Sequence, residues 1–305
     1  MTNPTRCGFT AVVGKPNVGK STLINHLVGR KIGITSPKPQ TTRQRIWGVK
    51  TVGVAQMIFV DTPGLILSRS LLGKTMLNHS KEVLSDCDLA LFVVDASDFA
   101  PEIGDRTAWR IFASEIKHRD STPPVYLILN KADKVKDKKE LLPIIKNFST
   151  LGNFQEVFPV SALKGDNLEN LEATILKNLP ENPHYFPSSE QDTQEETFRI
   201  SEIIREKILF LIHQEVPHGV AVAVEEIRPG KNPETLYIKG TIFVQRNSHK
   251  GILVGKDGKM LKKIGTLARK EIEFELKKSI YLDLWVKVNK EWQERGEMLR
   301  YLGYV

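Results

Sequence analysis

The stretch Gly14-Lys-Pro-Asn-Val-Gly-Lys-Ser21 decides the fold of this chain. It fits the pattern G-x-x-x-x-G-K-[ST], which is typical of a loop that joins a buried strand to a helix and binds phosphate. Apolar residues from Phe9 onward lead into this stretch, and Leu23, Ile24 and Leu27 mark one face of the helix that should follow. We expect backbone N–H groups of the loop and the positive end of the helix to face the phosphates of a nucleotide.

Two side chains of this stretch have specific chemical roles in such a loop. Lys20 is expected on the β- and γ-phosphates, and the Ser21 hydroxyl is placed to bind a Mg²⁺ ion that bridges the same phosphates. The expected nucleotide-binding residues of this segment are Gly14, Asn17, Val18, Gly19, Lys20, Ser21 and Thr22. The motif alone indicates a triphosphate, but it does not say which base.

The size and composition of the chain limit the classes of protein to which it can belong. With 305 residues it is long enough for two domains, each with its own core. Its net charge of +8 is compatible with a polyanionic partner. The two cysteines, Cys7 and Cys87, form no disulfide or metal-binding pattern, and there is no apolar run of the roughly 18 residues that span a bilayer. We therefore expect a cytoplasmic protein, with peripheral membrane contact left open.

A polar loop is expected after the first helix, at Ser36-Pro-Lys-Pro-Gln-Thr-Thr-Arg43. Its two prolines argue against regular structure. A Thr in such a loop can give Mg²⁺ a second hydroxyl while the γ-phosphate is present and release it after hydrolysis. We choose Thr42 for this role, with Thr41 as the alternative. Taken alone, the segment would be an ordinary polar connector.

The segment Asp61-Thr-Pro-Gly64 follows what the sequence predicts to be the second apolar strand. A carboxylate at the mouth of a buried strand needs a charge partner, and a Mg²⁺ ion held through water is such a partner. We expect the Gly64 backbone N–H to face the γ-phosphate. The predicted metal-binding residues are Ser21, Thr42 and Asp61, and the predicted catalytic residues are Lys20, Thr42, Asp61 and Gly64.

Selectivity for the base is predicted at the end of a later apolar strand, in Asn130-Lys-Ala-Asp133. The Asp133 carboxylate can accept hydrogen bonds from N1–H and the exocyclic amine of guanine, whereas adenine would leave it unpaired. Asn130 and Lys131 would brace the loop and pack on the base. Ligands of open parallel α/β sheets bind at the edge where such strands end. A second short loop is expected to touch the base through backbone groups, at Ser161 and Ala162.

With these motifs in order, residues 8 to about 180 resemble a translation-factor-type GTPase domain. The resemblance implies a mostly parallel α/β sheet, binding of GTP and GDP with Mg²⁺, and hydrolysis of GTP by water. It also implies switch loops at about residues 33–46 and 61–80.

One residue departs from the pattern of the small signalling GTPases. Leu65 stands where those proteins place a Gln that orients the attacking water, and an aliphatic side chain cannot do this. Intrinsic hydrolysis should therefore be slow, or another group must assist. In GTPases with such a replacement, an Asn in the phosphate loop often holds a potassium ion, so we hypothesise K⁺ near Asn17.

A change in composition predicts the boundary between two domains. From Pro180 to Glu196 the chain has three prolines, five acidic residues and no Lys or Arg, as expected of an exposed linker. We therefore predict a GTPase domain at residues 1–180, a linker at 181–196 and a second domain at 197–305. Helical spacing of apolar residues from Phe198 to Ile212, followed by two alternating runs, predicts a helix and two strands at the start of the second domain.

The second domain carries a G-x-x-G sequence, Gly255-Lys-Asp-Gly258, between two short helical stretches. Such a turn lets a nucleic-acid backbone approach closely. Residues 239–270 contain nine Lys and Arg against one acid, which is the charge pattern of phosphate contacts. Together with a third strand and a final helix, this order resembles a type II KH domain of α+β fold, with Trp285 and Trp292 expected in the core. The expected RNA-binding residues are Gly251, Gly255, Lys256, Asp257, Gly258, Lys259, Lys262 and Lys263.

The two domains together resemble one family of bacterial GTPases over essentially the whole chain. The resemblance implies a monomer that binds the 3′ end of small-subunit ribosomal RNA, helps the small ribosomal subunit to mature, and associates in part with the inner membrane. Two other functions stay open. One is a constitutive RNA-binding adaptor with a structural GTP site, and the other is a membrane-surface regulatory GTPase that uses its lysines on anionic lipid.

Overall fold

The computed structural model describes residues 4–36, 38, 40–97, 103–117, 122–212, 216–232 and 234–305. Pro37 and Pro39 of the predicted polar loop lie outside these residues. The chain divides into two compact units. The first comprises most of the chain up to Thr193, and the second comprises Gln194–Val305 together with the short segments Ser36–Pro39 and Ser70–Leu72. The predicted domain boundaries at residues 180 and 196 stay a prediction. No helix in the described ranges is long and apolar enough to cross a membrane.

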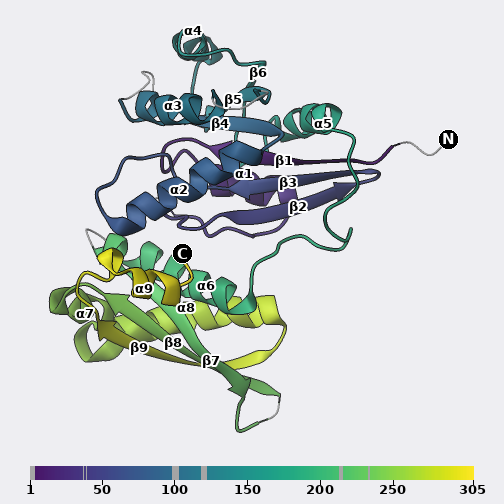
Figure 1. The fold of residues 1–305 in the computed structure, drawn as a ribbon. Helices are drawn as coiled ribbons and strands as arrows, with labels where there is room; N and C mark the ends of the chain where they lie inside the picture. The colour runs from purple at the N-terminus through teal and green to yellow at the C-terminus, as the bar shows by residue number, and fades with distance from the viewer. Residues whose placement is uncertain are drawn as a thin grey trace. The chain divides into compact units, whose positions relative to one another are not determined.

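The first unit is built on a six-stranded sheet in the order β2-β3-β1-β4-β5-β6 (Figure 1). Strand β2 runs antiparallel to β3, and the other neighbours are parallel. The mostly parallel α/β fold predicted from the sequence is thereby confirmed. The strands are β1 (Arg6–Val13), β2 (Ile46–Val52), β3 (Ala55–Asp61), β4 (Leu89–Asp95), β5 (Val125–Asn130) and β6 (Glu156–Pro159).

Helices cover both faces of this sheet, which explains why its central strands are apolar along their whole length. On one face, alternate residues of β1, β4 and β5 pack against α2, α3 and α4 in a single core. On the other face, Gly48 of β2 approaches Ile24 and Val28 of α1 so closely that a Cβ there would lie 2.8 Å from Val28. The helices are α1 (Lys20–Val28), α2 (Leu71–Asp86), α3 (Ile103–Ile116), α4 (Leu141–Ser149) and α5 (Leu168–Asn178).

Strand β2 corrects the predicted count of strands. The segment before Asp61 was expected to be the second strand, but Ile46–Val52 forms an antiparallel strand beside it, so Asp61 ends the third. The cause is local, because residues 46–52 lie at the end of a polar loop and are not bounded on that side by a turn signal. The position of Asp61 at the carboxyl end of a buried strand is as predicted.

The segment after Pro180 is hydrogen-bonded to the first unit through its backbone, although most of the side chains at residues 181–196 are exposed. The buried side chain of Gln56 accepts hydrogen bonds from the N–H groups of Tyr185 and Phe186, both at 3.0 Å, and donates to the Phe186 carbonyl at 2.9 Å. The Val49 N–H donates to the Gln191 carbonyl at 2.8 Å along the free edge of β2. The segment is attached through backbone groups and two aromatic rings, and its proline-rich, acidic composition gave no sign of these contacts.

The second unit combines a three-stranded sheet with helices on one of its faces, in the α+β order expected of a KH domain (Figure 1). Strand β8 lies in the centre, antiparallel to β7 and parallel to β9. Residues of α6 and α8, among them Ile204 and Ile264, form its core with Ile238 and Ile242 of β8. The elements are α6 (Glu196–Leu211), β7 (Ala221–Pro229), β8 (Thr235–Val244), α7 (Asn247–Val254), α8 (Lys259–Leu276), β9 (Ser279–Val288) and α9 (Gly296–Tyr301).

The two tryptophans expected in the core of this unit have different environments. Trp292 is fully buried, and its indole N–H donates to the Gly219 carbonyl at 3.0 Å. Trp285 is 55% exposed, so the prediction for this residue was wrong. The reason is the alternation of β9, in which Ile280 and Val286 face the helices while Tyr281 and Trp285 point to the uncovered face.

Candidate functional site

The phosphate loop is held in shape by two glycines that no other residue could replace without displacing neighbours. A Cβ at Gly14 would lie 2.2 Å from the carbonyl oxygen of Val93, and a Cβ at Gly19 would lie 2.3 Å from the side-chain nitrogen of Asn130. Both glycines also have positive φ, at 149° and 95°. The loop can therefore bring its backbone close to β4 and β5, and α1 begins directly after it at Lys20.

Lys20 is buried beneath this loop. Its Nζ donates to the carbonyl oxygens of Gly14 at 3.3 Å and Lys15 at 3.0 Å. Burial lowers the pKa of Lys20 to about 8, against the opposing effect of the nearby Asp61 carboxylate. Neutral carbonyl groups compensate a buried ammonium only weakly, so a phosphate is the partner that its charge favours.

Three residues predicted to bind Mg²⁺ converge from three different elements. Asp61 Oδ2 accepts hydrogen bonds from Ser21 Oγ at 2.6 Å and from Thr42 Oγ1 at 3.0 Å, and the two hydroxyl oxygens lie 2.9 Å apart. These contacts join the start of α1, the polar loop and the end of β3. They support the choice of Thr42 over Thr41 as the second hydroxyl.

The surroundings of Asp61 fit a magnesium ion. The carboxylate is 1% exposed, and its Oδ1 has no hydrogen-bond partner among the described residues. Burial raises the pKa of Asp61, and Lys20 and the two hydroxyls lower it. Hydroxyl and carboxylate oxygens are ligands that Mg²⁺ prefers. Within the described ranges no group of three or more His, Cys, Asp and Glu side chains could hold a metal ion.

The segment that follows Asp61 is attached to the phosphate loop. A Cβ on Gly64 would lie 2.7 Å from Pro16, which explains the need for glycine there. The next residue, Leu65, donates its N–H to the Gly14 carbonyl at 3.0 Å and buries its side chain in the core of the sheet, at 1% exposed. The Gly64 N–H therefore lies beside the loop that the γ-phosphate would touch.

Asn130 joins the predicted base-binding loops to the phosphate loop. Its Nδ2 donates to the Val18 carbonyl at 2.7 Å, and its Oδ1 accepts from the Ala162 N–H at 2.9 Å. Ser161 is fully buried beside Ala162. Asp133 follows in a short 3₁₀ helix and is partly exposed, so its carboxylate can be reached by a base. The three loops thus meet as the sequence predicted.

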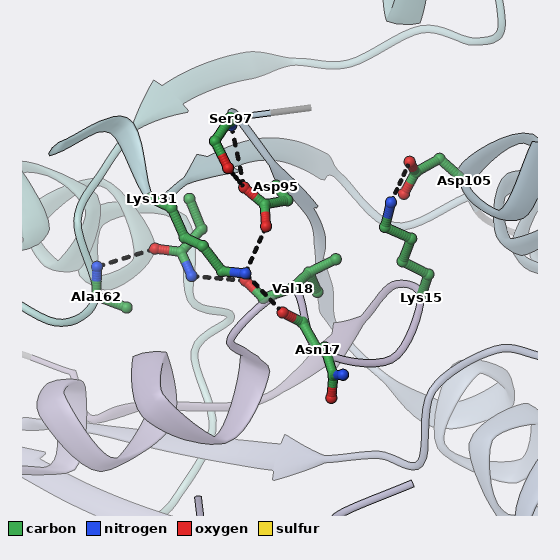
Figure 2. Close-up of polar contacts among 9 residues, drawn as sticks. Lys15, Asn17, Val18, Asp95, Ser97, Asp105, Lys131 and Ala162 are labelled. Atoms are coloured by element: carbon green, nitrogen blue, oxygen red, sulfur yellow. Dashed lines mark hydrogen bonds and ion pairs between the residues drawn. The ribbon is translucent and has the colours of Figure 1, made fainter. Parts of the chain in front are cut away.

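Lys131 makes a contact that sequence reasoning missed. Its Nζ donates to the Asn17 carbonyl at 2.8 Å and to the carboxylate of Asp95, at the end of β4 (Figure 2). Burial alone would raise the pKa of Asp95, but hydrogen bonds from Lys131 and Ser97 outweigh it and lower the pKa. A signal was present, since Asp95 ends an apolar strand in the same way as Asp61.

Of the two remaining residues of the predicted nucleotide site, Asn17 lies in the phosphate loop and Thr22 follows it directly. Asn17 is exposed and has a left-handed backbone with φ of 64°, and its side-chain amide points away from Lys131 (Figure 2). Thr22 is partly buried in the first turn of α1. Neither position contradicts the predicted roles, which stay predictions.

The G-x-x-G turn of the second unit presents an open backbone and exposed lysines. Gly255 and Gly258 both have φ of 72°, and Asp257 between them is left-handed at 54°, a conformation that Asp tolerates better than most residues. A Cβ on Gly258 or Gly251 would meet nothing within 4 Å. The backbone there is thus open to a ligand. The exposed basic side chains beside it are Lys256, Lys259, Lys262 and Lys263.

Two family models match the chain, one for each unit. Residues 9–131 match the 50S ribosome-binding GTPase family, and residues 215–293 match the KH domain family. These matches cover the nucleotide site up to Lys131 and the sheet and G-x-x-G turn of the second unit.

Individual proteins match the chain over almost its whole length. GTPase Era of Coxiella burnetii (strain Dugway 5J108-111) is 42% identical over 302 residues, which is 99% of both chains. A crystal structure of a variant of Aquifex aeolicus Era bound to GDP and AlF4⁻ has a TM-score of 0.93 and 42% identity, covering 99% of this chain and 100% of that one. A crystal structure of Era in complex with MgGDPNP and nucleotides 1506–1542 of 16S ribosomal RNA has the same TM-score and identity, covering 99% of each chain. With both units matched in one relative, this chain belongs to the GTPase Era family.

Proposed function

We propose that this protein is a GTP-hydrolysing, RNA-binding protein that assists assembly of the small ribosomal subunit. It binds the 3′ end of small-subunit ribosomal RNA, and its nucleotide state alters that binding. One observation carries the proposal: a single chain joins a GTPase-family unit to a KH unit, and it matches over 99% of its length the Era that was crystallised with MgGDPNP and nucleotides 1506–1542 of 16S ribosomal RNA. A cytoplasmic location, a monomeric state and partial association with the inner membrane are part of the proposal.

Each nucleotide-site residue has a role that follows from its position. Lys20 stabilises negative charge on the phosphates, Ser21 and Thr42 offer hydroxyls to Mg²⁺, and Asp61 balances the charge of that ion. When bound, the ion neutralises charge that develops on the phosphates during transfer. The Gly64 N–H faces the γ-phosphate, and the segment Asp61–Gly64 changes conformation when that phosphate leaves.

The guanine base is recognised beside this phosphate site. Asp133 accepts two hydrogen bonds from guanine, while Asn130 holds the loops that surround the base. Backbone groups at Ser161 and Ala162 complete the base site. The partial exposure of Asp133 and the burial of Asn130 and Ser161 support this division between ligand-binding and loop-holding residues.

Hydrolysis by this site is slow in the absence of a further group. The Leu65 side chain is buried in the core, where it cannot orient an attacking water. A potassium ion held near the exposed Asn17 would supply positive charge that stabilises the phosphates during hydrolysis. Hydrolysis is therefore expected to be faster in potassium than in sodium buffer, and Asn17→Ala should remove that difference. Equal rates in both buffers for the wild-type chain would contradict the potassium site.

The direct test of the proposed function is crosslinking of the protein to RNA in cells, followed by sequencing of the attached RNA. Reads concentrated at the 3′ end of small-subunit ribosomal RNA are the expected result. An even distribution over cellular RNA would contradict it. Lysine substitutions in the G-x-x-G turn should remove the peak, because that turn is the expected point of contact.

Two other functions have a specific observation in their favour. The buried Leu65 favours an RNA-binding adaptor that does not use hydrolysis, and single-turnover GTP hydrolysis with and without RNA separates this adaptor from the GTPase. The exposed lysines of the second unit would also suit anionic lipid. Flotation with anionic liposomes in competition with RNA tests this membrane role, and RNA is expected to displace the lipid.

A further inference from the structure

We propose that Asp95 is a positioning residue for guanine-nucleotide binding, which acts by holding Lys131 across the phosphate loop and so slows nucleotide dissociation. This inference rests on the guanine-nucleotide site proposed above and adds to it a residue of β4. It concerns how long the nucleotide stays bound, and leaves the chemistry of hydrolysis to Ser21, Thr42 and Asp61.

The register of the sheet places Asp95 beside the base-binding loop. Strands β4 and β5 are parallel neighbours, and Asp95 is the register partner of Asn130, the last residue of β5. Lys131 follows at once, with a left-handed backbone of φ 63°. From there its side chain extends to the Asp95 carboxylate and to the carbonyl of Asn17 (Figure 2). Lys131 thus spans β4, its own loop and the phosphate loop.

The Asp95 carboxylate is itself fixed in orientation. Its Oδ1 accepts hydrogen bonds from the Ser97 N–H at 3.0 Å and from Ser97 Oγ at 2.6 Å, which leaves Oδ2 to accept from Lys131. The side chains of Asp95 and Lys131 are 13% and 25% exposed. Because solvent and salt screen such a pair less than a surface pair, it can hold a side chain in place.

The negative charge of Asp95 is essential to this role. A lysine side chain has many rotamers, so its end stays over the phosphate loop only if a partner holds it there. The Asn17 carbonyl is neutral, and hydrogen bonds between charged groups are roughly twice as strong as those between neutral groups. Asp95 therefore supplies most of the hold on Lys131.

Holding Lys131 affects how firmly two loops stay together. The base-binding loop is joined to the phosphate loop by Asn130 at the Val18 carbonyl and by Lys131 at the Asn17 carbonyl. A nucleotide that contacts both loops can leave when these links open. Loss of the second link should therefore raise the dissociation rate, whereas the hydrolysis rate of GTP already bound should change little.

The experiment measures dissociation of a fluorescent GDP from the full chain with Mg²⁺. We expect Asp95→Asn to raise the dissociation rate about tenfold, since a charged hydrogen bond is lost. Asp95→Glu keeps the charge, so its dissociation rate should lie between those of Asp95→Asn and the wild-type chain. Single-turnover hydrolysis should stay within about twofold of the wild-type rate. Glu172→Gln is the matched control, because it removes the carboxylate of another lysine pair in the same unit, with Lys50 at 2.7 Å, and should leave dissociation unchanged.

A second background separates positioning from a merely structural role. If Asp95 acts through Lys131, then Asp95→Asn should add less than about twofold to the rate in a Lys131→Gln chain. The proposal would be overturned if Asp95→Asn raised the dissociation rate by the same factor in the wild-type and Lys131→Gln chains. It would also be overturned if Asp95→Asn released GDP at the wild-type rate. If Asp95→Asn does not fold, the same comparison with Asp95→Glu decides. Failure of the wild-type chain to bind GDP at all would instead overturn the proposed function.

Discussion

At the scale of single residues, Asp61 is the side chain around which the phosphate half of the site is arranged. It is almost fully buried, accepts from two hydroxyls with one oxygen, and has no hydrogen-bond partner for the other among the described residues. Lys20 lies close enough to affect its pKa. The Asp61 carboxylate and the Lys20 ammonium are both buried, so solvent cannot compensate their charges. A bound cation would compensate Asp61, and a bound phosphate would compensate Lys20.

Asp133 is expected to determine the choice of base. In Asp133→Asn the amide can donate to the C2 carbonyl of xanthine but cannot accept both guanine donors, so GDP affinity should fall at least about 100-fold while xanthosine diphosphate gains. Titration of both fluorescent nucleotides measures this change. The control is Asp137→Asn, an exposed residue that caps a short helix by accepting from the Lys139 N–H. Unchanged GDP binding by Asp133→Asn would place the base elsewhere.

Lys20 should make nucleotide binding sensitive to alkaline pH. Since burial lowers the pKa of Lys20 to about 8, the free protein loses this charge as pH rises through that value, and only the protonated form attracts phosphate. GDP affinity should therefore fall by up to about tenfold per pH unit above 8. Guanine itself also loses a proton in alkaline solution, so a control is needed. Lys20→Arg serves as that control, because its guanidinium does not titrate in this range. The same pH dependence in both proteins would contradict the assignment.

At the scale of elements, polar residues at the ends of parallel strands were predictable, and the elements that border them were less so. Asp61 and Asn130 follow continuous apolar runs, which are easily recognised. Strand β2 was not recognised from the sequence, because no turn signal marks the start of this edge strand after the polar loop. The attachment of the segment after Pro180 was not predictable for a different reason, since it depends on the buried Gln56 of another strand.

Gln56 is expected to hold that segment against the first unit. In Gln56→Ala three backbone groups of Tyr185 and Phe186 lose their partner, at a cost of about 2 kcal/mol. Chymotrypsin should then cleave at these aromatic residues at least about tenfold faster, as judged by mass spectrometry of the fragments. Gln191→Ala is the control, because Gln191 is exposed and contributes its backbone carbonyl. Equal cleavage of wild type and Gln56→Ala would refute the role.

The G-x-x-G turn is expected to hold RNA through phosphate contacts. Replacing both Lys256 and Lys259 by Ala should weaken binding to a single-stranded RNA and reduce the slope of log affinity against log salt by about 0.7 per lysine. The matched control removes Lys231 and Lys278, two exposed lysines elsewhere in the second unit. If the control pair alters the slope equally, the turn is not the point of contact. Filter binding at several salt concentrations measures both.

At the scale of the whole molecule, the proposal requires that the nucleotide and the RNA affect each other's binding. Such coupling is reciprocal, so any effect of GTP on RNA affinity must appear as an equal effect of RNA on GTP affinity. Thr42 is the residue through which the γ-phosphate is expected to act, since its hydroxyl joins the polar loop to Asp61.

Thr42→Val is expected to abolish this coupling. The wild-type chain should bind RNA differently with GDP and with a non-hydrolysable GTP analogue, and the variant should bind equally in both states because its loop cannot reach Mg²⁺. Thr41→Val is the control and should retain the difference. The reverse outcome would assign the role to Thr41. If wild-type RNA affinity is the same in both nucleotide states, the switch itself is contradicted.

The sequence by itself determined the chemistry of the nucleotide site and the order of the two units. The spacing of Gly14, Lys20 and Ser21, and of Asn130 and Asp133, is a local property of strand-to-loop junctions, and such junctions meet at one edge of a parallel sheet. Alternation along β9 could not show which face of its sheet is covered, so Trp285 was wrongly predicted to be in the core. Which face is covered depends on the helices that pack on the sheet.

The tertiary structure alone decided which partners these residues have. Asp95 acquires a role because β4 and β5 are neighbours in register, and Gln56 because a distant segment lies across its strand. Both contacts join residues far apart in the chain, so the apolar strand that ends at Asp95 could indicate a polar residue there but not its partner. Their energy depends on burial and on fixed geometry, which exist only once the sheet has assembled.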